Sequence, residues 1–167
     1  MRHFALASGD RYLRVSPHGD ELRLRADGGG LDSRTIFERL PLPHDRIALR
    51  TLDGRFLAVR PDHHHNFGLY PEDDFTPHAV FEEILWPDGR VSLRSCELTF
   101  VSDTEEAAVT ANRIEAGSAE RFELVPVPLP LIPTQRSESV GEVRPRVARV
   151  PRQAEPAIAK ERTRSQR

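Results

Sequence analysis

Cysteine and long hydrophobic runs are scarce in this sequence, and each scarcity excludes a class of protein. The one cysteine, Cys96, excludes an internal disulfide framework and a multi-cysteine zinc site. A reducing compartment fits that count. No apolar stretch approaches the roughly 20 residues that cross a bilayer, and the apolar run after Met1 is too short for a signal peptide. We therefore expect a soluble, cytoplasmic protein.

The motifs that mark common enzymes are also absent. No Gly-x-Ser-x-Gly, His-Glu-x-x-His or Walker pattern occurs, and no Lys-Ser/Thr follows the glycine run at 28–30. The carboxylate pair Asp73-Asp74 consists of sequence neighbours, whereas acid/base catalysis needs opposed carboxyl groups. These patterns predict a protein that is not an enzyme, with no cofactor and no assigned metal ligand.

Charge and proline divide the chain into unlike segments. The net charge of −2 combines +5 over residues 134–167 with −7 over residues 1–133. Half of the 14 prolines lie at or beyond Pro126, and the last aromatic residue is Phe122. We predict a folded domain at 3–126, a stiff Pro-rich linker at 127–133 and a disordered basic tail at 134–167, which has too little apolar surface to fold.

The predicted tail has two interpretations. It is a solubilising segment without a fixed partner, or it binds an acidic partner or a polyanion through Arg144, Arg146, Arg149 and Arg152. No aromatic residue is interleaved with these arginines, which argues against recognition of single-stranded nucleic acid by stacking.

Residues 3–126 contain an internal repeat, with segments 3–44, 45–88 and 89–126. The second and third segments open alike, at 46–59 and 90–101, and align at a spacing of 44 residues. Each segment also closes alike, with Phe37, Phe81 and Phe122 in equivalent positions. Such self-similarity indicates repeated supersecondary units that share one core.

Within each repeat the apolar period is two, which is typical of half-buried strands. Ile47 and Leu49 share one face, and Asp53-Gly54 marks a tight hairpin. The second repeat is thus predicted to hold strands at 46–51, 55–60, 67–70 and 80–85. Three such four-stranded units predict an all-β body that is closed or nearly closed, and a period of about 42 residues favours a β-trefoil over a propeller.

At these residues the sequence resembles the fascin family of β-trefoils. The matching stretches are 46–59, 89–94 and the strand ends that begin at Phe37, Phe81 and Phe122. The resemblance covers 3–126 and implies a single trefoil domain. Fascins, which bundle actin, are built from four trefoil domains. The family's actin-contacting positions cannot be matched residue by residue to this sequence, so none is carried over. The Gln-x-Trp signature of ricin-type trefoils is absent, which disfavours sugar binding by that mechanism.

The run His63, His64 and His65 is the most unusual local feature. It lies in the predicted turn between the second and third strands of the second repeat, after Asp62. It is an exposed polar loop, a ligand-recognition loop or a metal site, and only His63 and His65 would share an ion because neighbours point to opposite faces. His18 occupies the equivalent turn of the first repeat, and threefold separation is expected to keep it from sharing a metal with His63.

Two aromatic residues are further candidates for ligand binding. Trp86, before the turn at 87–89, either stacks on a ligand or caps the barrel floor, and the cap is the preferred interpretation. Tyr70, before Pro71, either contacts a ligand or has only a structural role in the fold.

The leading functional hypothesis is a monomeric, non-enzymatic binding or adaptor module that recognises a protein or a carbohydrate through its loops. One alternative is an actin- or filament-associated protein, as the fascin resemblance implies. Another is a metal-dependent enzyme that uses the turn from His63 to His65. A trefoil hosts many functions, so the fold does not choose among these three.

Overall fold

The computed structural model describes residues 2–104 and 106–128, and over these residues the chain is all-β. It holds twelve strands and one 3₁₀ turn, η1 (Pro77–Ala79). The strands are β1 (His3–Ser8), β2 (Arg11–His18), β3 (Glu21–Gly28), β4 (Phe37–Leu42), β5 (Arg46–Thr51), β6 (Phe56–Pro61), β7 (Phe67–Glu72), β8 (Val80–Leu85), β9 (Val91–Ser95), β10 (Phe100–Asp103), β11 (Val109–Arg113) and β12 (Glu123–Pro126). The all-β prediction is therefore confirmed.

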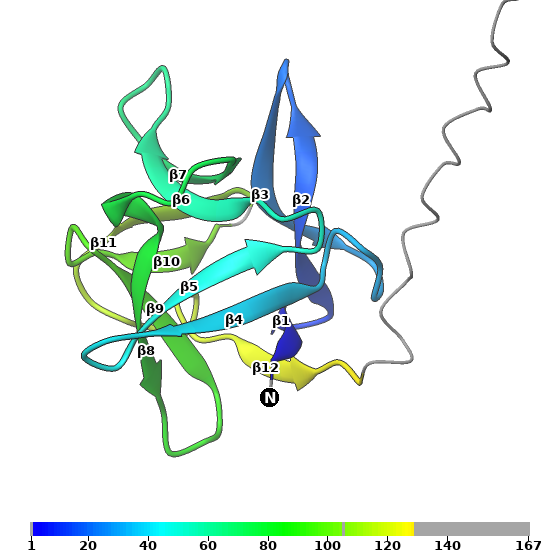
Figure 1. The fold of residues 1–167 in the computed structure, drawn as a ribbon, viewed down its shortest axis with the longest axis vertical. Coiled ribbons are helices and arrows are strands. Elements are labelled where there is room, and N and C mark those ends of the chain that lie inside the picture. Colours follow the sequence, from blue (N-terminus) through cyan, green and yellow to red (C-terminus); the bar gives the residue numbers. More distant parts are fainter. Residues whose placement is uncertain (1, 105, 129–167) are drawn as a thin grey trace, which may run out of the picture. The chain divides into compact units, whose positions relative to one another are not determined.

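Seven strands close into a barrel (Figure 1). The path β5-β6-β7-β11-β10-β9-β8 returns to its start because β8 also pairs with β5, where Ile47 lies opposite Phe81. The other five strands extend from β5 through β4 to β1, which pairs with both β2 and β12. Closure satisfies backbone groups that would otherwise line two exposed sheet edges.

The turns follow from local chemistry. Gly54 has a φ of 94°, which a side chain would disfavour, and its N–H donates to the Thr51 carbonyl at 3.0 Å. The turn after β9 has the same hydrogen bond, from Leu98 N–H to the Ser95 carbonyl at 3.0 Å. Ile47 and Leu49 of β5 both enter the core, as their period of two predicts.

The same strand registers recur at the spacings found in the sequence. In each repeat the glutamate that follows the closing phenylalanine lies opposite the same position of an opening strand. The three pairs are Glu38–Arg50, Glu82–Arg94 and Glu123–Ala7. A closing phenylalanine also meets an opening strand three times, in the pairs Phe37–Phe4, Phe81–Ile47 and Phe122–Val91. Equivalent sequence positions therefore occupy equivalent pairing positions.

One apolar cluster fills the interior. Phe4, Phe37, Phe81 and Phe122 are its largest fully buried side chains. Each stabilises the fold by roughly 1.5–3 kcal/mol relative to an exposed side chain. Aliphatic residues from all three sequence repeats, such as Leu13, Leu57 and Val101, complete the cluster. The repeats thus share a single core.

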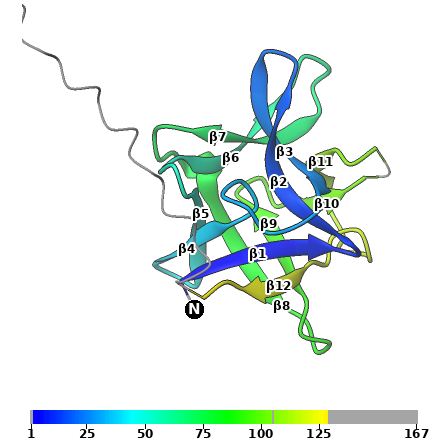
Figure 2. The ribbon, with the colours of Figure 1, turned by 90° about the vertical axis from the view of Figure 1, so that its right-hand side faces the viewer.

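The hairpins β2-β3 and β6-β7 project from the same end of the barrel and point the same way in both views (Figures 1 and 2). Further pairing ties this end together, since Gly68 of β7 lies opposite Thr110 of β11 and Arg25 bridges to Ala108. Residues far apart in sequence are consequently brought together beneath the two tips.

Within residues 2–104 and 106–128, no helix has the length and hydrophobicity to cross a membrane. The last strand ends at Pro126. Most of the linker predicted at 127–133 and all of the tail predicted at 134–167 lie outside the described residues, and Arg144, Arg146, Arg149 and Arg152 lie there too.

Candidate functional site: a polar cleft between two hairpins

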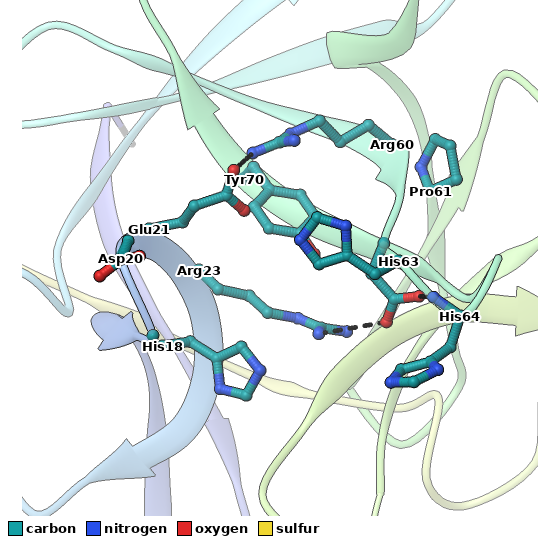
Figure 3. Close-up of a pocket in the computed structure, with 11 residues that line it drawn as sticks. His18, Asp20, Glu21, Arg23, Arg60, Pro61, His63, His64 and Tyr70 are labelled. Atoms are coloured by element: carbon teal, nitrogen blue, oxygen red, sulfur yellow. Dashed lines mark hydrogen bonds and ion pairs between the residues drawn. The ribbon is translucent and has the colours of Figure 1, made fainter.

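A cleft of about 730 Å³ lies between the tips of hairpins β2-β3 and β6-β7 (Figure 3). The first hairpin contributes residues 18–21 and Arg23, and the second contributes residues 60–64 and Tyr70. These side chains are almost all charged or polar. The cleft therefore offers hydrogen-bond donors and acceptors beside the apolar carbon atoms of the same side chains.

Arg23 forms the floor of the cleft and is 6% exposed. Its Nη1 lies 3.6 Å from Oδ2 of Asp62, and its Cζ lies 5.5 Å from the centre of the Tyr70 ring. No group in the described part of the chain accepts a hydrogen bond from its Nε. A buried guanidinium with an unused donor is unfavourable unless something else satisfies it.

Asp62 holds the histidine turn in place. Its Oδ1 accepts hydrogen bonds from the backbone N–H groups of His64 at 2.8 Å and Asn66 at 3.0 Å. Burial by itself would raise the pKa of Asp62, but these two hydrogen bonds and the nearby charge of Arg23 lower it below its ordinary value. The carboxylate thus orients the turn while pairing with the arginine on the cleft floor.

Arg60 covers Tyr70 from the other side. Its Cζ lies 3.9 Å from the ring centre, and it forms ion pairs with Glu21 at 3.1 Å and Glu72 at 2.9 Å. Tyr70 itself is only 3% exposed. The ring of Tyr70 is therefore occupied by guanidinium groups and is not an open stacking platform.

Arg23, Asp62 and His18 also line a second cavity of about 730 Å³, on the side of β10 and β11. Thr110 and Asn112 of β11 contribute to that cavity. The buried arginine thus lies where hairpins β2-β3, β6-β7 and β10-β11 approach one another. A ligand in either cavity would meet the same ion pair.

The candidates from sequence analysis fall into two groups. His63, His64 and Tyr70 line the cleft together, whereas His65, with a φ of 60°, does not. His18 lines the same cleft as His63, although the two turns belong to different repeats. Within residues 2–104 and 106–128, neither His63 nor His65 belongs to a group of three metal-ligating atoms lying within 4.8 Å of one another.

Trp86 lies elsewhere and makes internal contacts. Its Nε1–H donates to Ser92 Oγ at 2.8 Å, and the Cζ of Arg121 lies 3.8 Å from the centre of the indole ring. Ser92 in turn donates to the Glu120 carbonyl at 2.6 Å. These contacts fit the interpretation of Trp86 as a cap.

Sequence reasoning missed Arg23, Arg60 and Glu21. In a strand of period two, a long charged residue predicts a solvent-facing position, and no local pattern distinguishes Arg23 from Arg25. A signal was present only in the partner hairpin, where Gly68 leaves the space that the Arg23 guanidinium fills. No protein-family model matches this chain, and no curated protein matches its sequence.

Proposed function

We propose that this chain is a single fascin-like β-trefoil, without catalytic activity, that binds a carbohydrate in the polar cleft between hairpins β2-β3 and β6-β7. The trefoil part is supported by the three equivalent pairings of a closing phenylalanine with an opening strand. Adding the β1-β12, β4-β5 and β8-β9 ladders gives a ring of six strands, two from each repeat. The remaining strands form three hairpins, as a trefoil requires.

The observation that carries the binding proposal is the buried Arg23 on the cleft floor. Its Nη1 lies 3.6 Å from Oδ2 of Asp62, which is longer than a hydrogen bond, and its buried Nε has no acceptor in the described part of the chain. Nε lies against Gly68, whereas the terminal Nη groups still have N–H donors to offer to a ligand in the cleft. A ligand oxygen that accepts one of them offsets part of the cost of burying that charge.

The balance of charge favours a neutral, hydroxyl-rich ligand. The two arginines of the cleft pair with Asp62 and Glu21, and Asp20 also lines the cleft, so an anion would meet repulsion as well as attraction. An apolar peptide would leave these groups unpaired. Sugar hydroxyl groups donate and accept at the same atom, which suits alternating guanidinium, carboxylate and imidazole groups. A carbohydrate therefore fits the cleft better than an acidic or apolar protein segment.

Recognition by hydrogen bonding differs from recognition by stacking. Because guanidinium groups cover Tyr70, the cleft lacks the aromatic platform on which many sugar sites depend. We expect selectivity for the arrangement of hydroxyl groups, since a site built to pair a hydroxyl group discriminates strongly against analogues that lack it.

A glycan array probed with the full chain, followed by calorimetry on the saccharides that bind, tests the proposal. Arg23→Met keeps much of the side-chain volume and removes the donors, so binding should fall at least tenfold. His63→Ala/His64→Ala changes only exposed turn residues and should also weaken binding.

Two matched variants serve as controls. Arg46→Met removes an exposed arginine outside the cleft, and His65→Asn changes the neighbouring turn residue to one that tolerates a positive φ. Both should bind like the unmodified chain. An array without any bound saccharide contradicts carbohydrate recognition, whereas saccharide binding that survives Arg23→Met contradicts the assignment to this cleft.

The trefoil part has a separate test. Nuclear magnetic resonance should show contacts between Val91 and Phe122 as well as between Ile47 and Phe81, because both pairs occupy equivalent positions. The absence of either contact from a folded sample argues against the threefold arrangement.

A further inference from the structure

Three metal-ligating side chains converge beside the start of β8 and the end of β9, and none of them lines the cleft. Cys96 and Glu97 lie in the turn between β9 and β10, and His78 lies in η1. Cys96 Sγ is 3.7 Å from His78 Nδ1 and 3.9 Å from Glu97 Oε1, and the latter two atoms are 3.8 Å apart. The three donor atoms thus form a nearly equilateral triangle.

We propose that His78, Cys96 and Glu97 bind a divalent zinc-like metal ion, with the fourth coordination position open to solvent or to a ligand. Thiolate, imidazole and carboxylate are the ligands that zinc takes in proteins, at metal–ligand distances of roughly 2.0–2.3 Å. Tetrahedral angles at such distances place donor atoms roughly 3.3–3.6 Å apart. The observed triangle would contract by only a few tenths of an ångström.

The backbone holds both turns close together. Phe81 lies opposite Ser95 in the β8-β9 ladder, which brings the residues just before β8 beside those just after β9. The Ser95 N–H donates to the Thr99 carbonyl at 2.8 Å, and the Glu97 N–H donates to Ser95 Oγ at 3.2 Å. On the other side, Ala79 is fully buried and anchors η1. Only side-chain rotation is then needed to complete the site.

The donor set is not a requirement of the fold. The equivalent turn in the second repeat has the same backbone hydrogen bonds, from Gly54 to Thr51 and from Thr51 to Arg55. The residues that correspond there to His78, Cys96 and Glu97 are Arg34, Leu52 and Asp53. The turn therefore forms without these ligands, and structural need does not account for the meeting of His78, from the second repeat, with Cys96 and Glu97, from the third.

A nucleophilic cysteine is a poorer explanation of the same cluster. In a Cys–His–acid relay the thiol and the acid contact opposite ring nitrogens, whereas here both approach His78 Nδ1. A metal ion would displace the thiol proton into solvent and compensate the carboxylate charge.

Cobalt(II) is the probe for this site, because its thiolate complex absorbs light while zinc is silent. The full chain, prepared without a histidine tag and kept reduced, should bind one cobalt ion with a thiolate charge-transfer band. Zinc should displace the cobalt and remove the band. Cys96→Ser should abolish the band, and His78→Ala should weaken binding at least tenfold; all three ligands are exposed, so these variants should fold.

The histidine turn supplies the matched control. His63→Ala/His64→Ala/His65→Asn removes the other concentration of imidazoles in the described chain and should leave the cobalt band unchanged. The proposal is overturned if no band appears, if one ion binds per two chains, or if the histidine-turn variant loses the ion. Since the cluster lies outside the cleft, these outcomes are independent of saccharide binding.

Discussion

The guanidinium group of Arg23 occupies the space that a side chain at Gly68 would fill. An ideal Cβ at Gly68 would lie 2.8 Å from Arg23 Nε and 2.8 Å from its Nη2, closer than non-bonded atoms approach. Arg23 belongs to the first repeat and Gly68 to the second. The floor of the cleft thus depends on a missing side chain in one repeat and a long one in another.

The first prediction concerns this pair. Gly68→Ala should force Arg23 away from Asp62 and Tyr70, lowering the free energy of unfolding by about 1–3 kcal/mol, as overpacking does, and weakening saccharide binding. Urea unfolding and calorimetry measure the two effects. Arg23→Met, added to Gly68→Ala, should recover much of the lost stability because the flexible thioether yields. Additive effects of the two substitutions would show that the residues do not compete for space.

The second prediction concerns Glu38, which pairs with Arg2 at 2.5 Å and with Arg50. Burial by itself would raise its pKa, but the hydrogen bonds and charges of Arg50 and Arg2 lower it below the ordinary 4.5. The ionised carboxylate therefore contributes its full stabilisation at a pH above the ordinary pKa, which applies to the unfolded chain. That contribution is lost as the pH falls through the lower pKa of the folded state. Glu38→Gln should cost about 1.5–3 kcal/mol at neutral pH, and this difference should shrink in acid.

The equivalent residue of the second repeat is the control for Glu38. Among the described residues Glu82 pairs with Arg94 alone, and its side chain is 44% exposed. Glu82→Gln should therefore cost no more than about 1 kcal/mol, the usual limit for a surface ion pair. Unfolding curves for both variants across the acidic range make the comparison. Equal costs, or a Glu38→Gln difference that grows in acid, would contradict the argument.

The third prediction separates Trp86 from the ligand site. Trp86→Phe removes the hydrogen bond to Ser92 and should lower stability by about 1–2 kcal/mol, with unchanged saccharide binding. Ser92→Ala should cost at least as much, because it also leaves the buried Glu120 carbonyl without its 2.6 Å donor. Thermal unfolding and the glycan array provide the measurements. Loss of glycan binding in a stable Trp86→Phe protein would return Trp86 to the list of ligand residues.

The fourth prediction compares two neighbouring glycines. A Cβ at Gly28 would lie 2.9 Å from Thr35 Cγ2 and 3.0 Å from the Tyr12 carbonyl oxygen, whereas one at Gly29 would meet nothing within 4 Å. Gly28→Ala should therefore destabilise the fold by about 1–3 kcal/mol, and Gly29→Ala should change stability by less than about 0.5 kcal/mol. Chemical denaturation resolves the two values. Similar costs would mean that β3 yields to admit the methyl group.

The strands were the most predictable part of the molecule. The second repeat was expected to hold strands at 55–60 and 67–70, and the structure has them at Phe56–Pro61 and Phe67–Glu72. Alternation of apolar residues and the turn at Gly54 are local signals, and the 44-residue spacing reinforces them. The equivalent pairs Glu38–Arg50 and Glu82–Arg94 follow from the same spacing.

The candidate site was predictable only in part. His63, His64 and Tyr70 stand out in the sequence because histidine runs and aromatic residues are rare there. Arg60 and Glu21 do not stand out, since charged residues at strand ends predict solvent exposure. They form an ion pair at 3.1 Å across two hairpins of different repeats. Because Glu21 and Arg60 lie in different repeats, the sequence pattern within one repeat does not predict that contact.

The sequence by itself determined the all-β class, the strand positions and the polar histidine turn, because short-range periodicity and turn chemistry encode each of them. Only the tertiary structure decided that Arg23 is buried beside Asp62 and that His78 meets Cys96 and Glu97. Both arrangements join residues from separate strands or turns. Their distances depend on how the barrel closes and which strands lie side by side, and no local pattern carries that information.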